Sequence, residues 1–159
     1  MLDWLPAPLH RALLPPAYRA RHIWRRMRRT PIRGCTVVIT NLTGDVLLLR
    51  HSYGPKGWLL PGGGVARGED PEAAARREVA EELGLTLGHV EALGVLNEEI
   101  SGCPVTGYLF TSVTGEFPRP DNREVIEARF FPSHSLPEPL GPVTAQRIEI
   151  WRQRGLKDV

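Results

Sequence analysis

Three glutamates near the middle of the chain, Glu78, Glu81 and Glu82, have the spacing of a catalytic metal site. Each residue of an α-helix advances by about 100°, so the three side chains fall within an arc of about 100° on one face. Carboxylates this close repel one another, and a hard divalent cation such as Mg²⁺, which prefers oxygen ligands, removes the repulsion. A cation there would neutralise pyrophosphate oxygens and lower the pKa of bound water, so the spacing favours hydrolysis of a phosphoanhydride bond.

A solvated acidic helix face is the competing interpretation, because most charge runs have that origin. Two neighbouring features count against it. Ala75, Val79 and Leu83 form a core-facing stripe beside the acidic arc, so the carboxylates are expected at the edge of buried surface. The glycines at 62–64 place exposed backbone next to the same helix, where amides can approach phosphate oxygens and a carbonyl can bind metal.

The segment from Gly63 to Leu85 resembles the Nudix box. Gly63 is followed after five residues by Glu69, after seven more by Arg77-Glu78, and then by Val79-Ala80-Glu81-Glu82-Leu83-Gly84-Leu85. These 23 contiguous residues match every fixed position of the box. The order of strands expected between about 35 and 132 is also similar to that of a Nudix domain, whereas the first 33 residues have no counterpart in it.

The resemblance implies an α/β/α Nudix sandwich and hydrolysis of a nucleoside diphosphate linked to another group. By position, Glu78, Glu81 and Glu82 would bind one or more Mg²⁺ or Mn²⁺ ions, with the carbonyl of Gly62 as a further ligand. One of these glutamates, or one from a later loop, would deprotonate the attacking water. Arg77 would orient a carboxylate, and Glu69 and Gly63 would support this arrangement.

Two later glutamates, Glu124 and Glu127, precede the aromatic-rich run 128–131 and are the candidates for the later-loop base. Glu124 is preferred because its distance from that run resembles the placement in the family, and Glu127 comes second. The alternative is an ordinary surface loop whose acids are solvated.

One bounded helix and several short apolar runs must position these residues. Asp70 as N-cap, Pro71 in the first turn and Gly84 at the C-terminal left-handed position predict a helix over 70–83. Strands around a central helix, followed by a terminal helix, indicate an α/β fold with a mixed central sheet covered by helices. The strands are expected at 37–39, 46–49, 58–60, 90–96, 105–113 and 128–131, and the terminal helix at 142–154.

The composition is that of an ordinary globular protein. With 159 residues, 42% of them hydrophobic and 24% charged, the chain suits one domain with its own core. No apolar run approaches the roughly 18 residues of a membrane span, and polar residues interrupt the N-terminus, so we expect a cytoplasmic protein without a secretory signal. Cys35 and Cys103 lack zinc-site spacing and are expected to be reduced.

Residues 1–33 differ from the rest, because they carry eight arginines and a single acidic residue. We interpret them as a basic N-terminal extension, helical around 18–29, that precedes a Nudix domain over 34–159. The favoured reading is a helix packed on the domain with solvated arginines. Homodimerisation comes next, followed by contact with RNA or an anionic surface.

The sequence leaves the substrate open, because no mark of a Nudix subclass follows the box. Tyr53 and Trp58 are candidates for stacking on a nucleobase, although such aromatics are more often core. Arg50, His51 and Lys56 are candidates for phosphate contacts, with a solvated rim as the alternative. A small nucleotide is the first substrate hypothesis and an RNA 5′ end the second; a non-catalytic sensing module is the third, and the undamaged box disfavours it.

Overall fold

The structure is a computed structural model that describes residues 32–52, 54, 56–100, 103–120, 122–141 and 143–155. The predictions for residues 1–31 and for Tyr53 fall outside these residues. The described elements, in chain order, are β1 (Ile32–Thr40), β2 (Val46–His51), β3 (Gly62–Gly64), α2 (Pro71–Leu83), β4 (Val90–Ile100), β5 (Cys103–Val113), β6 (Val125–Phe131) and α3 (Thr144–Gly155).

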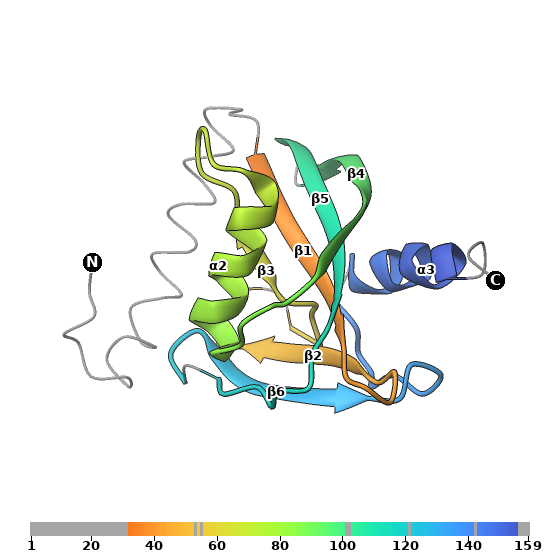
Figure 1. Ribbon diagram of the computed structural model, residues 1–159. Coiled ribbons are helices and arrows are strands. Elements are labelled where there is room, and N and C mark those ends of the chain that lie inside the picture. Colours follow the sequence, from red (N-terminus) through yellow and green to blue (C-terminus); the bar gives the residue numbers. More distant parts are fainter. Residues whose placement is uncertain are drawn as a thin grey trace.

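The strands form one mixed sheet in the order β4-β5-β1-β2-β6, with β3 paired to β1 off this path. β1 is parallel to β5 over its whole length and antiparallel to β2 and β3. Figure 1 shows α2 and α3 on opposite sides of the sheet. The predicted α/β sandwich with a mixed central sheet is therefore confirmed.

Alternation along β1 builds the two halves of the core, because successive side chains of a strand point to opposite faces. Val37 and Ile39 pack with the apolar stripe of α2 on one face, and Val38 packs with Ile148 of α3 on the other. All four side chains are buried, and each contributes about 1.5–3 kcal/mol relative to an exposed position. Because both of its faces are buried, β1 is firmly held, and it supports the candidate site.

The helix α2 begins and ends as its capping residues predict. The Asp70 carboxylate accepts a hydrogen bond from the Ala73 amide at 3.0 Å, and Pro71 opens the helix. Gly84 ends it in the left-handed conformation at φ 61°, donating its N–H to the carbonyl of Ala80. Within the described residues, no helix is both long enough and apolar enough to cross a membrane.

The prediction of a strand at 58–60 is wrong. Trp58 and Leu59 form only isolated bridges, and the third strand runs through Gly62–Gly64 instead, where it pairs with residues 34–36 of β1. The apolar pattern at 58–60 arises from core packing, whereas glycines have low strand propensity and gave no signal. Strand β6 also begins at Val125, earlier than expected, so Glu127 lies within a strand and not in the preceding loop.

Candidate metal-binding active site

The three glutamates of the acidic arc lie at different depths on α2. Glu82 is buried with 6% of its surface exposed. The side chain of Glu78 is 18% exposed, and that of Glu81 is 64% exposed. The face therefore runs from the core to solvent, as expected for carboxylates beside the buried stripe of the helix.

The buried carboxylate of Glu82 is held by groups from two strands. The Gly62 amide donates a hydrogen bond to its Oε2 at 3.3 Å. The Nε2 atom of His51, at the end of β2, lies 3.6 Å from its Oε1. A carboxylate this deep needs such polar neighbours, because burial without them costs several kcal/mol. Glu82 is thus held in place by the protein itself.

Two glycines of β3 let the backbone approach this helix and β1 closely. Gly62 has φ 146°, and a Cβ there would lie 2.2 Å from the Cys35 carbonyl oxygen. A Cβ on Gly63 would lie 2.4 Å from the Glu78 carboxylate. Both positions therefore require glycine, the first for the fold and the second for the carboxylate.

Glu69, Arg77 and Glu78 form a continuous chain of ion pairs. Arg77 donates to both oxygens of Glu69, from Nε at 2.9 Å and from Nη2 at 3.1 Å, and from Nη1 to Glu78 at 2.8 Å. The hydrogen bonds from Arg77 lower the pKa of Glu69, and the two carboxylates raise the pKa of Arg77. Glu69, Arg77 and Glu78 are thus in contact, and the roles of Arg77 and Glu69 stay predictions.

The surroundings of Glu78 disfavour ionisation of its carboxyl group. Burial raises its pKa, Arg77 opposes that shift, and the charges of Glu81 and Glu124 add to it. Burial likewise raises the pKa of the Cys35 thiol, whose Sγ lies 3.6 Å from the Gly63 carbonyl oxygen. Cys35 is therefore a neutral thiol, and the charged donors of the site are oxygens.

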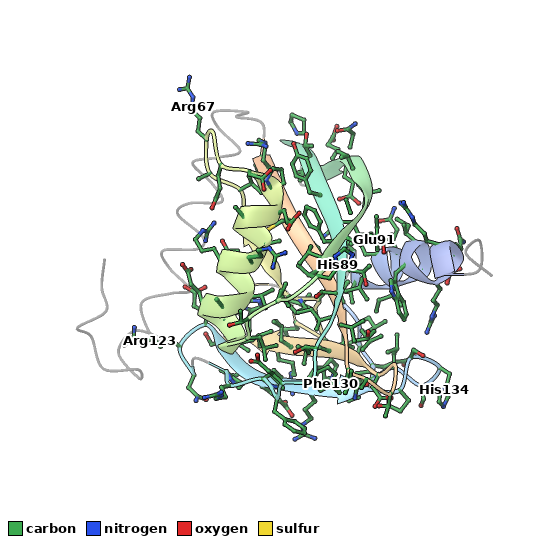
Figure 2. The ribbon with its side chains drawn as sticks, viewed as in Figure 1. Arg67, His89, Glu91, Arg123, Phe130 and His134 are labelled. Atoms are coloured by element: carbon green, nitrogen blue, oxygen red, sulfur yellow. The ribbon has the colours of Figure 1, made fainter. Side chains whose placement is uncertain are left out.

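Glu124 and Glu127 have different surroundings. Glu124 lies just before β6, and its carbonyl accepts a hydrogen bond from the Ser52 amide at 2.8 Å. Its charge acts on Glu78, which places it on the side of the acidic face. Figure 2 shows Arg123, the residue before Glu124, beside one end of α2, and Arg67 beyond the other end. Glu127 instead pairs with Arg50 at 3.4 Å and with Arg129 at 2.8 Å.

A cavity of about 260 Å³ is lined by residues of β1, β3, β5 and α3, among others. Gly62, Gly63 and His51 line the cavity and also contact the glutamates of the acidic face. The strand β3 therefore lies between the cavity and the glutamates of α2. The glycines in the cavity wall are Gly34, Gly62, Gly63 and Gly107, and its polar residues are Thr36, His51, Thr144 and Arg147.

Of the predicted substrate contacts, His51 lines this cavity, whereas Arg50, Lys56 and Trp58 do not. Trp58 packs edge-to-face on Phe131 with ring centroids 4.7 Å apart, and Arg50 lies over the Trp58 ring at 5.7 Å. Lys56 is exposed, and Tyr53 is outside the described residues. The stacking and phosphate roles of these residues stay predictions.

Arg147 is a cavity residue that the sequence analysis missed. It stands four residues after Val143 and four before Trp151, so one charged residue interrupts an apolar helical stripe. That interruption is the sequence signal by which it could have been found. His51 was considered only for phosphate contacts, whereas its Nε2 atom lies 3.6 Å from the Glu82 carboxylate.

The donors of the site suit a hard divalent cation. Carboxylate oxygens and a nearby backbone carbonyl are the ligands that Mg²⁺ and Mn²⁺ favour. In the described part of the chain, no three His, Cys, Asp or Glu side chains already converge on one point. Arg77 instead pairs with Glu78 at 2.8 Å and lies 3.6 Å from Glu81. A cation would compete with Arg77 for these oxygens.

Sequence comparison relates the chain to RNA pyrophosphohydrolases over part of its length. The RNA pyrophosphohydrolase of Rhodospirillum rubrum is 41% identical over 76 residues, which are 44% of this chain and 46% of that protein. That of Saccharophagus degradans is 41% identical over 59 residues, or 37% of this chain and 35% of that protein. The chain thus spans less than half the length of these curated relatives.

Solved structures match a larger share of the chain. A MutT NUDIX hydrolase from Burkholderia pseudomallei has a TM-score of 0.69 and 28% identity, covering 76% of this chain and 97% of its own. The NUDIX domain of Shewanella oneidensis NrtR, solved with ADP ribose, has a TM-score of 0.70 and 21% identity, covering 79% of this chain and 88% of its own. The latter shows the fold alone. The sequence profile of the NUDIX domain matches residues 30–151, and the chain is therefore a member of the Nudix hydrolase family.

Proposed function

We propose that the chain hydrolyses a phosphoanhydride bond of a nucleotide-type substrate with the help of a divalent cation held by Glu78, Glu81 and Glu82. Mg²⁺ is our first choice and Mn²⁺ the alternative. One observation carries the proposal: the buried Glu82 and the largely buried Glu78 lie against Gly62 and Gly63, which also line the cavity. A substrate in the cavity would thus have its phosphates at the carboxylates.

The cation, when bound, would supply charge neutralisation at the phosphate oxygens and a lowered pKa for the attacking water. The carbonyl of Gly62 is proposed as its further ligand. Arg77, held by the two hydrogen bonds that it donates to Glu69, would fix the carboxylate of Glu78. This arrangement would supply positioning, on which phosphoryl transfer chiefly depends.

Glu124 is our candidate for the base that takes the proton of the attacking water. Its charge already acts on Glu78, whereas Glu127 is engaged by Arg50 and Arg129. Glu81, the most exposed of the three helix carboxylates, is the alternative base.

The cavity favours a substrate with one nucleoside inside it. Its volume of about 260 Å³ lies just below the roughly 300–1,000 Å³ of typical small-molecule sites. A second nucleoside or a sugar would therefore lie outside. A small nucleoside polyphosphate fits this description.

An RNA 5′ end is the second candidate substrate. The names of the curated relatives favour it, and so do the eight arginines of residues 1–33, which would attract RNA phosphates. An RNA would place its first nucleoside in the cavity and continue outside. A non-catalytic role is disfavoured, because the glutamates of the box are all present.

A substrate panel tests the proposal. Nucleoside triphosphates, dinucleotides, nucleotide sugars and a 5′-triphosphate RNA would be incubated with Mg²⁺, and release of phosphate, pyrophosphate or monophosphate measured. We expect turnover that is lost on chelation and that falls by orders of magnitude in Glu82→Gln. Equal turnover after exhaustive chelation contradicts the proposal.

The RNA alternative needs a separate variant. Replacing Arg25, Arg26, Arg28 and Arg29 with glutamine should weaken turnover of RNA and leave turnover of free nucleotides unchanged. An equal effect on both substrates would exclude an RNA-specific role for these arginines.

A further inference from the structure

Arg147 extends from α3 to the wall of the cavity. Its Nη1 donates to the Thr36 hydroxyl of β1 at 2.5 Å, and its Nη2 donates to the Glu98 carboxylate of β4 at 3.1 Å. Between these strands lies Gly107 of β5, where a Cβ would be only 3.3 Å from Nη2. The guanidinium therefore occupies space that a larger residue at 107 would restrict.

The ion pair is buried, with side chains of Arg147 and Glu98 only 12% and 15% exposed. Removing two charges from water costs free energy that their attraction often fails to recover, and an apolar pair of similar volume is commonly as stable. The buried Nε of Arg147 has no hydrogen-bond partner among the described residues, which adds to that cost. Stability alone therefore does not account for a guanidinium at this position.

The chemistry of the wall points to a ligand edge that accepts hydrogen bonds. A guanidinium has five N–H groups and no acceptor, and the bonds to Thr36 and Glu98 use two of them. The guanidinium lies over Gly107, and Gly34 adds no side chain to the wall beside it, so a flat ring can lie against the backbone at Gly34. Guanine presents two acceptors, O6 and N7, on one edge, whereas adenine presents a donor beside its N7.

We propose that Arg147, oriented by Thr36 and Glu98, binds the acceptor edge of the substrate base and makes the site prefer guanine over adenine. The proposal rests on the proposed function for its substrate class and adds the base. Glu98 and Thr36 are positioning residues, because they act through the guanidinium. The preference should be roughly ten- to a hundredfold, the range of one well-placed arginine–guanine pair.

Equilibrium binding of GMP and AMP to the full chain tests the proposal without requiring turnover. We expect GMP to bind roughly ten- to a hundredfold more tightly than AMP. The key variant is Arg147→Met combined with Glu98→Leu, because it removes both charges together and leaves neither one buried alone. It should retain the wild-type melting temperature and bind the two monophosphates about equally. Arg152→Met, on the same helix but bonded to the Ser133 carbonyl, is the matched control and should keep the preference.

Kinetics separate this inference from the proposed function. With GTP and ATP, the ratio of kcat/KM values should favour GTP in the wild type and approach one in the double variant. No turnover of any substrate, together with tighter GMP binding, would refute the proposed function and leave the inference standing. Equal binding of GMP and AMP to the wild type, or a preference that survives in the double variant, refutes the inference.

Discussion

The three glycines of β3 give a prediction whose magnitude follows from the geometry. In Gly63→Ala, the new Cβ would lie 2.4 Å from the Cδ and Oε2 atoms of Glu78. Ordinary van der Waals contact begins near 3.4 Å, so the carboxylate must retreat by about 1 Å. The Glu78 side chain can move, and the backbone at Gly63 is not in the left-handed region, so the fold should survive.

A shift of about 1 Å in a positioning group costs on the order of a hundredfold in rate. We therefore expect Gly63→Ala to lower kcat/KM about a hundredfold and to weaken Mg²⁺ activation, while the melting temperature changes by no more than a few degrees. The assay is steady-state hydrolysis of the best substrate over a Mg²⁺ titration, with circular dichroism on the same preparation.

The two neighbouring glycines supply the controls. A Cβ on Gly64 would meet nothing within 4 Å, so Gly64→Ala should keep wild-type activity. In Gly62→Ala the Cβ would lie 2.2 Å from the Cys35 carbonyl oxygen at a strained φ of 146°, so the fold should lose at least about 2 kcal/mol. Full activity of Gly63→Ala, or equal losses at Gly63 and Gly64, would refute the reasoning.

The acidic residues give three more predictions. Burial raises the pKa of Glu78, so its contribution to stability is present below the unfolded pKa and is lost as pH rises through the folded pKa. Glu78→Gln should therefore raise the melting temperature of the metal-free protein at neutral pH and less so near pH 4; a lower value at every pH contradicts this. The pKa of Glu69 is lowered by Arg77, so its stabilisation is present above the unfolded value of about 4.5 and is lost as pH falls through the folded pKa. Acid unfolding followed by fluorescence should accordingly be less steep in Glu69→Gln, and an unchanged profile would exclude that contribution. Finally, Glu124→Gln should lower kcat by about 10²–10⁴-fold, as expected for a general base, and Glu127→Gln by less than about tenfold; the reverse order of kcat values would assign the base to Glu127.

Local signals explain what the sequence could predict. The helix α2 depends on Asp70, Pro71 and Gly84, which act within a few residues of the chain, and its bounds were found within one residue. The acidic arc also follows from spacing within one helix. These features need no knowledge of distant contacts.

Long-range packing explains what was missed. The strand at Gly62–Gly64 exists because β1 pairs with it across 28 positions, and three glycines carry no strand signal of their own. The interrupted apolar stripe marks Arg147 but not its partner Thr36, which lies 111 positions away. Likewise, Glu82 is much less exposed to solvent than Glu81, and this difference depends on which strands cover the helix.

The short glycine strand has a thermodynamic consequence for ligand binding. One of its edges is bonded to β1, its amide at Gly62 contacts Glu82, and its backbone forms part of the cavity wall. A nucleoside that restricts the motion of this strand would reduce the conformational entropy that the protein loses when an ion binds afterwards. Linkage then requires that the ion strengthen nucleoside affinity by the same factor, so the two ligands should bind with positive cooperativity.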